Sequence, residues 1–286
     1  MLSSLRRAAA LAVAALGLAA AAAAQTPLER GTYLVNSISA CANCHTMKGP
    51  PGAGMDYAGG FVIGDNQGPF RAVASNITPD PETGIGRWTD EQIVAAVRNG
   101  RRPDGTVVGP PMAIELYNKM SDEDVRAIVA YLRTLKPIRN QVAKSAYRIP
   151  LGVPPPARNV SAPPRTDKVA YGGYLAGPLG HCIECHTPQL RGRRDYANQL
   201  GAGGFELDAP GGGKIVAANI TPDRETGIGA WTDAQIKAAI TDGVRPDGAK
   251  LSPPMAYGWY KNIAPGDLDA IVAYLRSLKP IKHKVR

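Results

Sequence analysis

The stretch Cys41-Ala42-Asn43-Cys44-His45 decides how this chain folds. Two cysteines and a following histidine at this spacing occur in zinc sites, in redox-active dithiols and at covalent haem attachment sites, and exported proteins also use cysteines for disulfide bonds. Each of these chemistries requires different partners elsewhere in the sequence. The remainder of the sequence therefore determines which of these chemistries applies.

Most of the sequence occurs as two similar repeats. Residues 41–45 read CANCH and residues 182–186 read CIECH, and a long segment that begins with NITPD at Asn76 has a near copy that begins at Asn219. Each copy is long enough to hold its own core, which favours two homologous domains over a solenoid. We expect these domains at residues 25–140 and 167–286, and we expect the proline-rich residues 141–166 to form an extended, semi-rigid linker.

The first 24 residues stand apart from the repeats. Arg6 and Arg7 precede an alanine-rich apolar run that ends in Ala22-Ala23-Ala24, which is the pattern of a secretory signal peptide cleaved after Ala24. A retained amphipathic or membrane-spanning anchor is the alternative, but the run is only weakly hydrophobic. We therefore expect a periplasmic protein that is soluble or peripherally associated with the membrane.

Charge limits the kinds of partner. The 286 residues carry a formal net charge of +9, which becomes +7 when the two arginines of the leader are removed. A basic protein is attracted to acidic protein surfaces and to anionic membranes. The lysines and arginines are scattered and form no stripe interleaved with aromatic residues, so we expect no nucleic-acid partner.

Helix signals recur at matching places in the two copies. Residues 89–92 form a capping box that opens a helix ended by Gly100, and residues 232–235 repeat this box. Another helix is expected to begin at Ser121, and a third to cover residues 28–39. The sequence therefore predicts an all-α fold of few helices and long loops rich in glycine and proline. Such loops bury little apolar surface, so a cofactor has to fill the centre.

A covalently bound c-type haem accounts for both motifs. Cys41 and Cys44 would attach the haem through thioether bonds, and His45 would ligate the iron. A zinc site would need a second pair of ligands in each copy, and a redox dithiol or a disulfide would give the histidine no role. We therefore expect two covalent haems. The matching residues of the second copy are Cys182, Cys185 and His186.

The second axial ligand of each iron is found by elimination, since it should recur in both copies and no cysteine is spare. His181 aligns with Ala40 and His283 lies in the basic tail, so the first copy has no second histidine to offer. Met255 is the only methionine after the motif in the second copy, and it aligns with Met112. We predict that Met112 and Met255 are the axial ligands.

The remaining methionines do not fit this role. Met47, Met55 and Met120 have no methionine at the matching positions of the second copy, and Met120 is expected in the core. Met112 and Met255 each follow a pair of prolines, which restrict the backbone of the loop that presents the thioether.

Four other repeated residues are candidates for contact with the haem propionates. The indole N–H of Trp88 and of Trp231 could donate to a propionate, and a plain core role is the alternative for both. Asn76 and Asn219 could also donate to a propionate, although their place before a Thr-Pro-Asp sequence favours a turn-forming role. Trp259 occurs in the second copy alone and is expected either to pack or to lie near the second haem.

The motifs resemble those of a known family. The segments CANCH, NITPDPETGIGRWTDEQ, GPPM and MSDEDVRAIVAYLRTL look like the c-type cytochrome subunits of periplasmic alcohol, aldehyde and sugar-acid dehydrogenases and of some molybdenum hydroxylases. The resemblance covers nearly all of the chain after the leader. It implies class I cytochrome c folds with His/Met-ligated haems that pass electrons from a dehydrogenase to the respiratory chain. Many of these subunits carry three haems, whereas this chain has two motifs.

Electron transfer without catalysis is the leading hypothesis. Histidine and methionine fill both axial positions of each iron and leave none open for a substrate. The alternative is a dihaem redox enzyme. A peroxidase would need an iron with an axial position that can become vacant, and acid–base groups beside it. A thiosulfate-oxidising cytochrome is expected to use a cysteine ligand. We therefore expect no enzymatic activity, a periplasmic dehydrogenase as electron donor, and a terminal oxidase, a quinone-linked protein or another cytochrome as acceptor.

Overall fold

The computed structural model describes residues 25–49, 52–208 and 213–285. The predicted signal peptide lies outside these described residues. Within them, no helix combines the length and the apolar character that crossing a bilayer requires. The first repeat and the linker contain α1 (Pro27–Asn36), α2 (Ala42–His45), β1 (Val62–Gly64), β2 (Phe70–Val73), α3 (Asp90–Asn99), α4 (Ile114–Tyr117), α5 (Asp122–Thr134) and β3 (Ala146–Tyr147).

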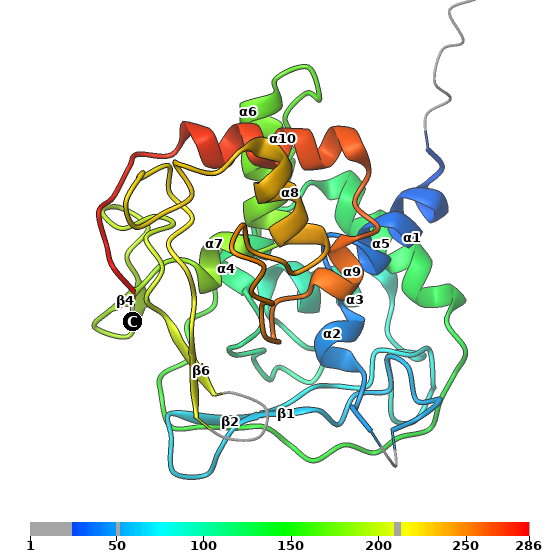
Figure 1. Ribbon diagram of the computed structural model, residues 1–286. Coiled ribbons are helices and arrows are strands. Elements are labelled where there is room, and N and C mark those ends of the chain that lie inside the picture. Colours follow the sequence, from blue (N-terminus) through cyan, green and yellow to red (C-terminus); the bar gives the residue numbers. More distant parts are fainter. Residues whose placement is uncertain (1–24, 50–51, 209–212, 286) are drawn as a thin grey trace, which may run out of the picture.

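The second repeat follows a similar order of helices (Figure 1). It begins with α6, which continues into the π-helical turn η1, and it ends with the long helix α10. Its elements are α6 (Lys168–Tyr174), η1 (Leu175–Leu179), α7 (Cys182–Cys185), β4 (Gln189–Leu190), β5 (Arg193–Arg194), β6 (Glu206–Asp208), β7 (Lys214–Val216), α8 (Asp233–Thr241), α9 (Tyr257–Tyr260) and α10 (Pro265–Ser277).

Each repeat is built on two helices that cross at very short distance. In the first repeat α1 packs on α5, and in the second repeat α6 packs on α10. Both crossings depend on a glycine. A Cβ atom on Gly31 would lie 1.9 Å from the carbonyl oxygen of Ala127, and one on Gly172 would lie 1.8 Å from that of Ala270. Only a residue without a side chain allows the two backbones to approach so closely.

The capping signals in the sequence are confirmed. The Thr89 hydroxyl accepts a hydrogen bond from the backbone N–H of Gln92 over 3.2 Å, and the Gln92 side chain accepts one from the N–H of Thr89 over 2.8 Å. These bonds satisfy N–H groups at the start of α3 that have no partner inside the helix. The helix ends at Gly100, whose φ of +65° favours glycine. The second capping box opens α8 in the same way.

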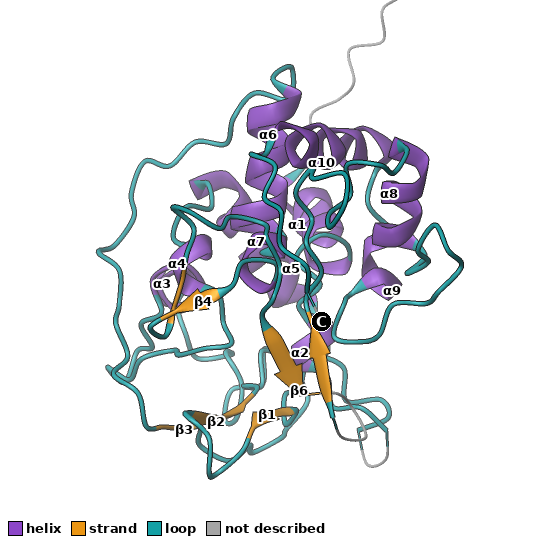
Figure 2. Ribbon diagram, turned by 60° about the vertical axis from the view of Figure 1, so that its left-hand side comes forward, coloured by secondary structure: helices purple, strands orange, loops and turns teal. Residues whose placement is uncertain are grey.

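In the described part of the chain, three small antiparallel sheets accompany the helices, and the sequence did not predict them (Figure 2). The largest has the order β1-β2-β3, with Val62 opposite Val73 and Phe70 opposite Tyr147. The other two are the pairs β4-β5 and β6-β7. Strands of two to four residues are too short to show a clear alternation of apolar and polar residues. The expected all-α class therefore describes the helical core but not these sheets.

The predicted linker lies along the first repeat. Its strand β3 adds to the sheet of β1 and β2, and side chains of the first repeat bind its carbonyl groups. Asn118 donates to the carbonyl oxygen of Pro155 over 3.1 Å, and Arg98 donates to that of Ala157 over 2.5 Å. The backbone N–H of Asn159 donates to Asp122 over 3.0 Å. The linker is thus fixed by specific hydrogen bonds in addition to the stiffness of its prolines.

The two repeats share a core. Buried apolar side chains of both repeats form one continuous cluster, which includes Leu34 and Val129 of the first repeat and Leu175 and Ile271 of the second. A buried ion pair joins α1 to α5 at the edge of this cluster, where Arg30 lies 2.7 Å from Asp124. Both side chains are at least nine-tenths buried.

Candidate haem-binding site

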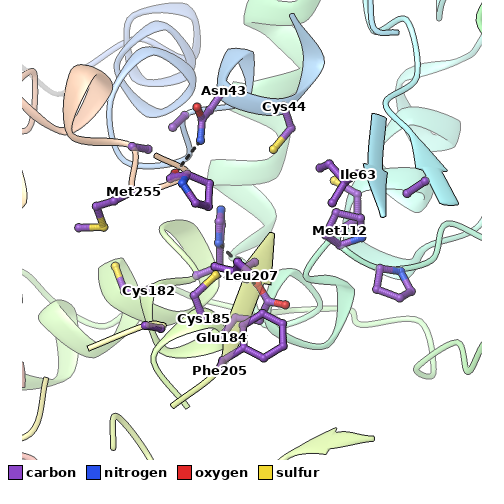
Figure 3. Close-up of a pocket in the computed structure, with 18 of the residues that line it drawn as sticks. Asn43, Cys44, Ile63, Met112, Cys182, Glu184, Cys185, Phe205, Leu207 and Met255 are labelled. Atoms are coloured by element: carbon purple, nitrogen blue, oxygen red, sulfur yellow. Dashed lines mark hydrogen bonds and ion pairs between the residues drawn. The ribbon is translucent and has the colours of Figure 1, made fainter. Parts of the chain in front are cut away.

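One large cavity opens between the repeats. Its volume is about 2620 Å³, well above the roughly 300–1,000 Å³ of an ordinary ligand pocket, so it has room for more than one cofactor. In Figure 3, Cys44 and Met112 lie on one side of this cavity, and Cys182 and Met255 lie on the other. All predicted attachment and axial residues line it, namely Cys41, Cys44, His45, Met112, Cys182, Cys185, His186 and Met255.

Each motif is a single helical turn. The backbone N–H of His45 donates to the carbonyl oxygen of Cys41 over 2.9 Å, and that of His186 donates to Cys182 over 3.0 Å. This turn brings both cysteines and the histidine of a motif to the same cavity. The residue before each motif has a positive φ, +44° at Ala40 and +41° at His181. The two motifs therefore share one local conformation.

A carbonyl group orients each histidine of the motifs. His45 Nδ1 lies 2.8 Å from the carbonyl oxygen of Ser75, and His186 Nδ1 lies 2.7 Å from that of Ala218. A carbonyl oxygen only accepts, so Nδ1 carries the hydrogen and Nε2 is left with a lone pair for a metal. Burial lowers the pKa of both imidazoles, which favours the neutral form that ligates metals.

None of the four cysteines forms a disulfide bond. Burial raises the pKa of Cys41 to about 12 and that of Cys182 to about 11, and it also raises the pKa of Cys44 and of Cys185. Redox-active dithiols instead have a lowered pKa, because they react as thiolates. Among the described residues, no cluster of three His, Cys, Asp or Glu side chains could hold a metal ion by itself. Both findings weigh against the redox and zinc alternatives.

The two methionines lie in equivalent loops. Met112 and Met255 each stand two residues before a short helix, α4 and α9 respectively. Met255 also lines a smaller neighbouring cavity together with Cys182 and His186, so the structure brings it close to the motif of its own repeat. Met120 is 1% exposed and belongs to the core, as predicted.

The side chain of Asn76 forms hydrogen bonds with neighbouring groups of the protein. Its side-chain N–H groups donate to Thr83 over 3.1 Å and to the carbonyl oxygen of Ile138 over 2.8 Å, while its Oδ1 accepts from the backbone of Thr78 over 3.0 Å. Asn219 makes the corresponding bonds in the second repeat. Both N–H groups of each amide are engaged, which favours the turn-forming role over contact with a propionate.

The two repeated tryptophans remain suited to a propionate. Trp88 and Trp231 line the cavity, and neither indole N–H makes a hydrogen bond within the part of the chain that the structure describes. A half-buried indole usually finds a partner for this group. Contact of these indoles with a carboxylate of the cofactor stays a prediction.

Two arginines at the cavity were not predicted from the sequence. Arg102 donates to the carbonyl oxygen of Val107 over 3.1 Å and to the Ser75 hydroxyl over 3.4 Å, and Arg245 pairs with Asp247 at 3.5 Å. Both line the cavity, and a guanidinium suits a carboxylate such as a propionate. The repeat could have identified them, because the two arginines occupy matching places in the repeated segments RRPDG and VRPDG.

Comparison with known proteins finds a matching family model and several relatives. Residues 28–136 match the family model described as Cytochrome c. The chain is 33% identical to the cytochrome c subunit of an alcohol dehydrogenase (quinone) from Gluconacetobacter polyoxogenes, with 92% of this chain and 60% of that subunit aligned. It is also 33% identical to the fructose dehydrogenase cytochrome subunit of Gluconobacter japonicus, with 90% of this chain and 54% of that subunit aligned.

A third relative is more similar in length. The chain is 29% identical to a diheme cytochrome c-type protein of Cereibacter sphaeroides, and the alignment covers 85% of this chain and 83% of that protein. By contrast, the chain spans little more than half the length of the two dehydrogenase subunits. The chain therefore contains a cytochrome c domain and is related to the cytochrome c subunits of alcohol and fructose dehydrogenases.

Proposed function

We propose that this chain is a periplasmic dihaem c-type cytochrome that transfers electrons from a dehydrogenase to the respiratory chain and catalyses no reaction itself. One observation carries the proposal: both Cys-x-x-Cys-His motifs and both repeat-matched methionines meet at a single cavity. The proposal assigns one haem to each of two tandem domains, residues 25–140 and residues 167–286. The leader, residues 1–24, would direct export.

The chain offers a complete set of side chains for each haem. In the first repeat Cys41 and Cys44 would attach the cofactor, and His45 and Met112 would occupy its two axial positions. In the second repeat the same roles belong to Cys182, Cys185, His186 and Met255. The cysteines without disulfide bonds, the unprotonated Nε2 atoms and the volume of the cavity all fit this group.

Bound haem would supply one-electron exchange between ferric and ferrous iron. The protein contributes a fixed orientation of its ligands, since the carbonyl groups of Ser75 and Ala218 hold the two histidines. With His45, Met112, His186 and Met255 as ligands, neither iron would offer a coordination position to a substrate, which would suit a relay and disfavour a peroxidase. Both motifs face one cavity, which supports passage of electrons from one repeat to the other.

The choice of partner rests on the relatives. Their names identify cytochrome subunits of alcohol and fructose dehydrogenases, which supports a dehydrogenase as the donor for this chain. The acceptor would be a terminal oxidase, a quinone-linked protein or another cytochrome. Co-purification of the tagged holoprotein from its native host tests the donor. Recovery of a dehydrogenase in stoichiometric amount is expected, and recovery of the cytochrome alone would favour a free shuttle.

The first experiment measures the number of haems per chain. The exported holoprotein, quantified as its pyridine haemochrome, should contain two haems per chain. Replacing Cys41 and Cys44 by alanine should remove one of them, and replacing Cys182 and Cys185 should remove the other. One haem in the unaltered protein would contradict the proposal. Amino-terminal sequencing of the same sample should begin at Gln25 if the leader is cleaved as expected.

Axial ligation is the second measurement. Met112→Ala and Met255→Ala should each weaken the long-wavelength ferric band of methionine-ligated haem and convert one haem to another spin or ligation state. Met47→Leu is the control and should leave the spectrum unchanged, because Met47 is not among the described residues that line the cavity. Rapid turnover of peroxide or thiosulfate by the unaltered protein would instead support the dihaem enzyme.

A further inference from the structure

The loop that presents Met255 is held from outside its own repeat. Asn43, which lies inside the first motif, donates from Nδ2 to the carbonyl oxygen of Pro254 over 3.1 Å (Figure 3). Pro254 directly precedes Met255. The first haem motif and the distal loop of the second repeat are therefore joined by a direct hydrogen bond.

The second repeat itself does little to hold this loop. Ser252, Pro253 and Pro254 are exposed, and the two prolines have no N–H to donate. The N–H of Met255 makes only a long bond of 3.4 Å to Ser252, inside the loop. Among the described residues, Asn43 is the one donor to the carbonyl oxygen of Pro254.

A second contact between the repeats follows on the other side of Met255. The ammonium of Lys48, three residues after the first motif, lies 4.8 Å from the ring centroid of Trp259 in α9. A cation over the face of an indole is attracted by the ring. Asn43 and Lys48 therefore hold the chain just before and just after the predicted methionine ligand.

In the first repeat, residues near the second motif contact α4 after Met112, since the ring centroid of His181 lies 5.8 Å from that of Tyr117 and Arg193 lies 3.7 Å from Glu115. Among the described residues, however, no side chain of the second motif donates to the proline before Met112.

Glu184 stands at the position that corresponds to Asn43, and its carboxylate accepts a hydrogen bond from Arg194 over 3.3 Å. A carboxylate has no hydrogen to donate to a carbonyl group. Leu116 takes the place of Trp259 and offers no aromatic ring. The hydrogen bond to the residue before the methionine is thus specific to the Met255 loop.

We propose that Asn43 is a positioning residue for the second haem site and holds the Met255 thioether against the iron from across the repeat boundary. This inference rests on the proposed function, because it presupposes a haem in each repeat. It makes the strength of axial ligation in the second repeat depend on the first motif, whereas Met112 has no such dependence on residue 184.

The test measures how easily imidazole displaces each methionine in the reduced holoprotein. Each axial methionine gives its own strongly shifted methyl resonance in proton NMR, which Met112→Ala and Met255→Ala assign. In Asn43→Leu the imidazole concentration for half-displacement of Met255 should fall roughly 2- to 12-fold, as expected for the loss of one hydrogen bond. The value for Met112 should not change.

Asn262→Leu is the matched control. Asn262 donates to the carbonyl oxygen of Asn36 over 3.0 Å, which is also a bond between the repeats, but it lies beyond α9. An equal shift in Asn43→Leu and Asn262→Leu, or no shift in Asn43→Leu, would overturn the proposal. Absence of both methionine resonances from the unaltered protein would refute the proposed function instead.

A further variant covers failure of haem attachment in Asn43→Leu. Lys48 lies outside the motif, so Lys48→Met should still load both haems. It removes the contact with Trp259 and should lower the half-displacement concentration for Met255 roughly 2- to 5-fold. An unchanged value in Lys48→Met would overturn the two-sided clamp.

Discussion

The hydroxyl group of Tyr33 donates to Oδ2 of Asp267 in the other repeat over 2.9 Å. Tyr174 makes the same contact in the opposite direction and donates to Oδ2 of Asp124 over 2.7 Å. The two tyrosines occupy matching positions of the repeats, as do the two aspartates. The repeats therefore meet through an approximately twofold, self-complementary interface, in which each buried carboxylate is bound by a tyrosine from the other side.

Tyr174→Phe should lower the free energy of unfolding of the holoprotein by about 1–3 kcal/mol. The change leaves the buried Asp124 carboxylate without one of its donors and also removes a hydroxyl that accepts from the N–H of Ser121 over 3.0 Å. Denaturant unfolding followed by haem absorbance measures the loss. Tyr257→Phe is the control, because its hydroxyl makes no hydrogen bond within the described part of the chain. Equal stability of the two variants would contradict a role for the interface bond.

Asp124→Asn should cost about 3–5 kcal/mol of unfolding free energy, because it leaves the Arg30 charge buried without its counterion. The matched control is Asp90→Asn, which removes the partner of Arg133 at 2.9 Å on the surface. Asp90 is 64% exposed, and breaking such a pair should cost no more than about 1 kcal/mol. Chemical denaturation of both variants tests the contrast, and losses of similar size would show that burial of Arg30 does not matter.

Gly31→Ala should destabilise the protein by at least about 1–3 kcal/mol, the usual cost of overpacking. The new methyl group would lie 1.9 Å from the backbone oxygen of Ala127, so α1 and α5 would have to separate. Gly266→Ala provides the comparison in α10, since its Cβ would meet open space. We expect that variant to be neutral or slightly stabilising. Thermal unfolding of the two variants measures the difference, and a neutral Gly31→Ala would refute the tight crossing.

Low pH should destabilise the two loops that begin with the sequence NITPD at Asn76 and Asn219. Hydrogen bonds from the backbone and side chain of Thr83 lower the pKa of Asp80, and those of Thr226 lower the pKa of Asp223. A lowered pKa in the folded state means that the unfolded chain binds protons first. The stabilisation is therefore complete above the ordinary pKa of about 3.9 and is lost as the pH falls through the folded pKa.

Asp80→Asn should accordingly reduce the dependence of unfolding free energy on pH below about pH 4. Urea unfolding at a series of acidic pH values measures this slope. Glu91→Gln, which removes one exposed carboxylate from α3, is the charge-matched comparison. A slope unchanged by Asp80→Asn would show that the Thr83 bonds do not bias protonation.

Much of the helical core could be predicted because its signals are local. The Thr89 and Thr232 capping boxes fix the starts of α3 and α8 by hydrogen bonds between residues three apart. The pairing of Met112 with Met255 also came from sequence alone, because the repeat removes every methionine without a counterpart. The structure brings both to the cavity with the motifs, and their role as axial ligands stays a prediction.

Other features depend on contacts between distant parts of the chain. The sheet of β1, β2 and β3 brings together residues from 62 to 147, and its strands are too short to show a periodic pattern. The groups that accept hydrogen bonds from the Asn76 side chain include the carbonyl oxygen of Ile138, which lies far along the sequence. Hydrogen bonds of this kind become visible only once the chain is folded, so the sequence could not exclude Asn76 as a propionate ligand.

The glycine at each helix crossing is the same in both repeats, whereas other positions differ between them. Gly31 and Gly172 leave no room for any other side chain, so both copies retain the same helix contact. The tyrosine–aspartate contacts between the repeats are also retained, whereas the copies differ where Asn43 corresponds to Glu184 and Leu116 to Trp259. An ancestral pair of identical halves would have had two interchangeable sites. Divergence at these positions has made the halves non-interchangeable, so swapping them would not rebuild the same protein.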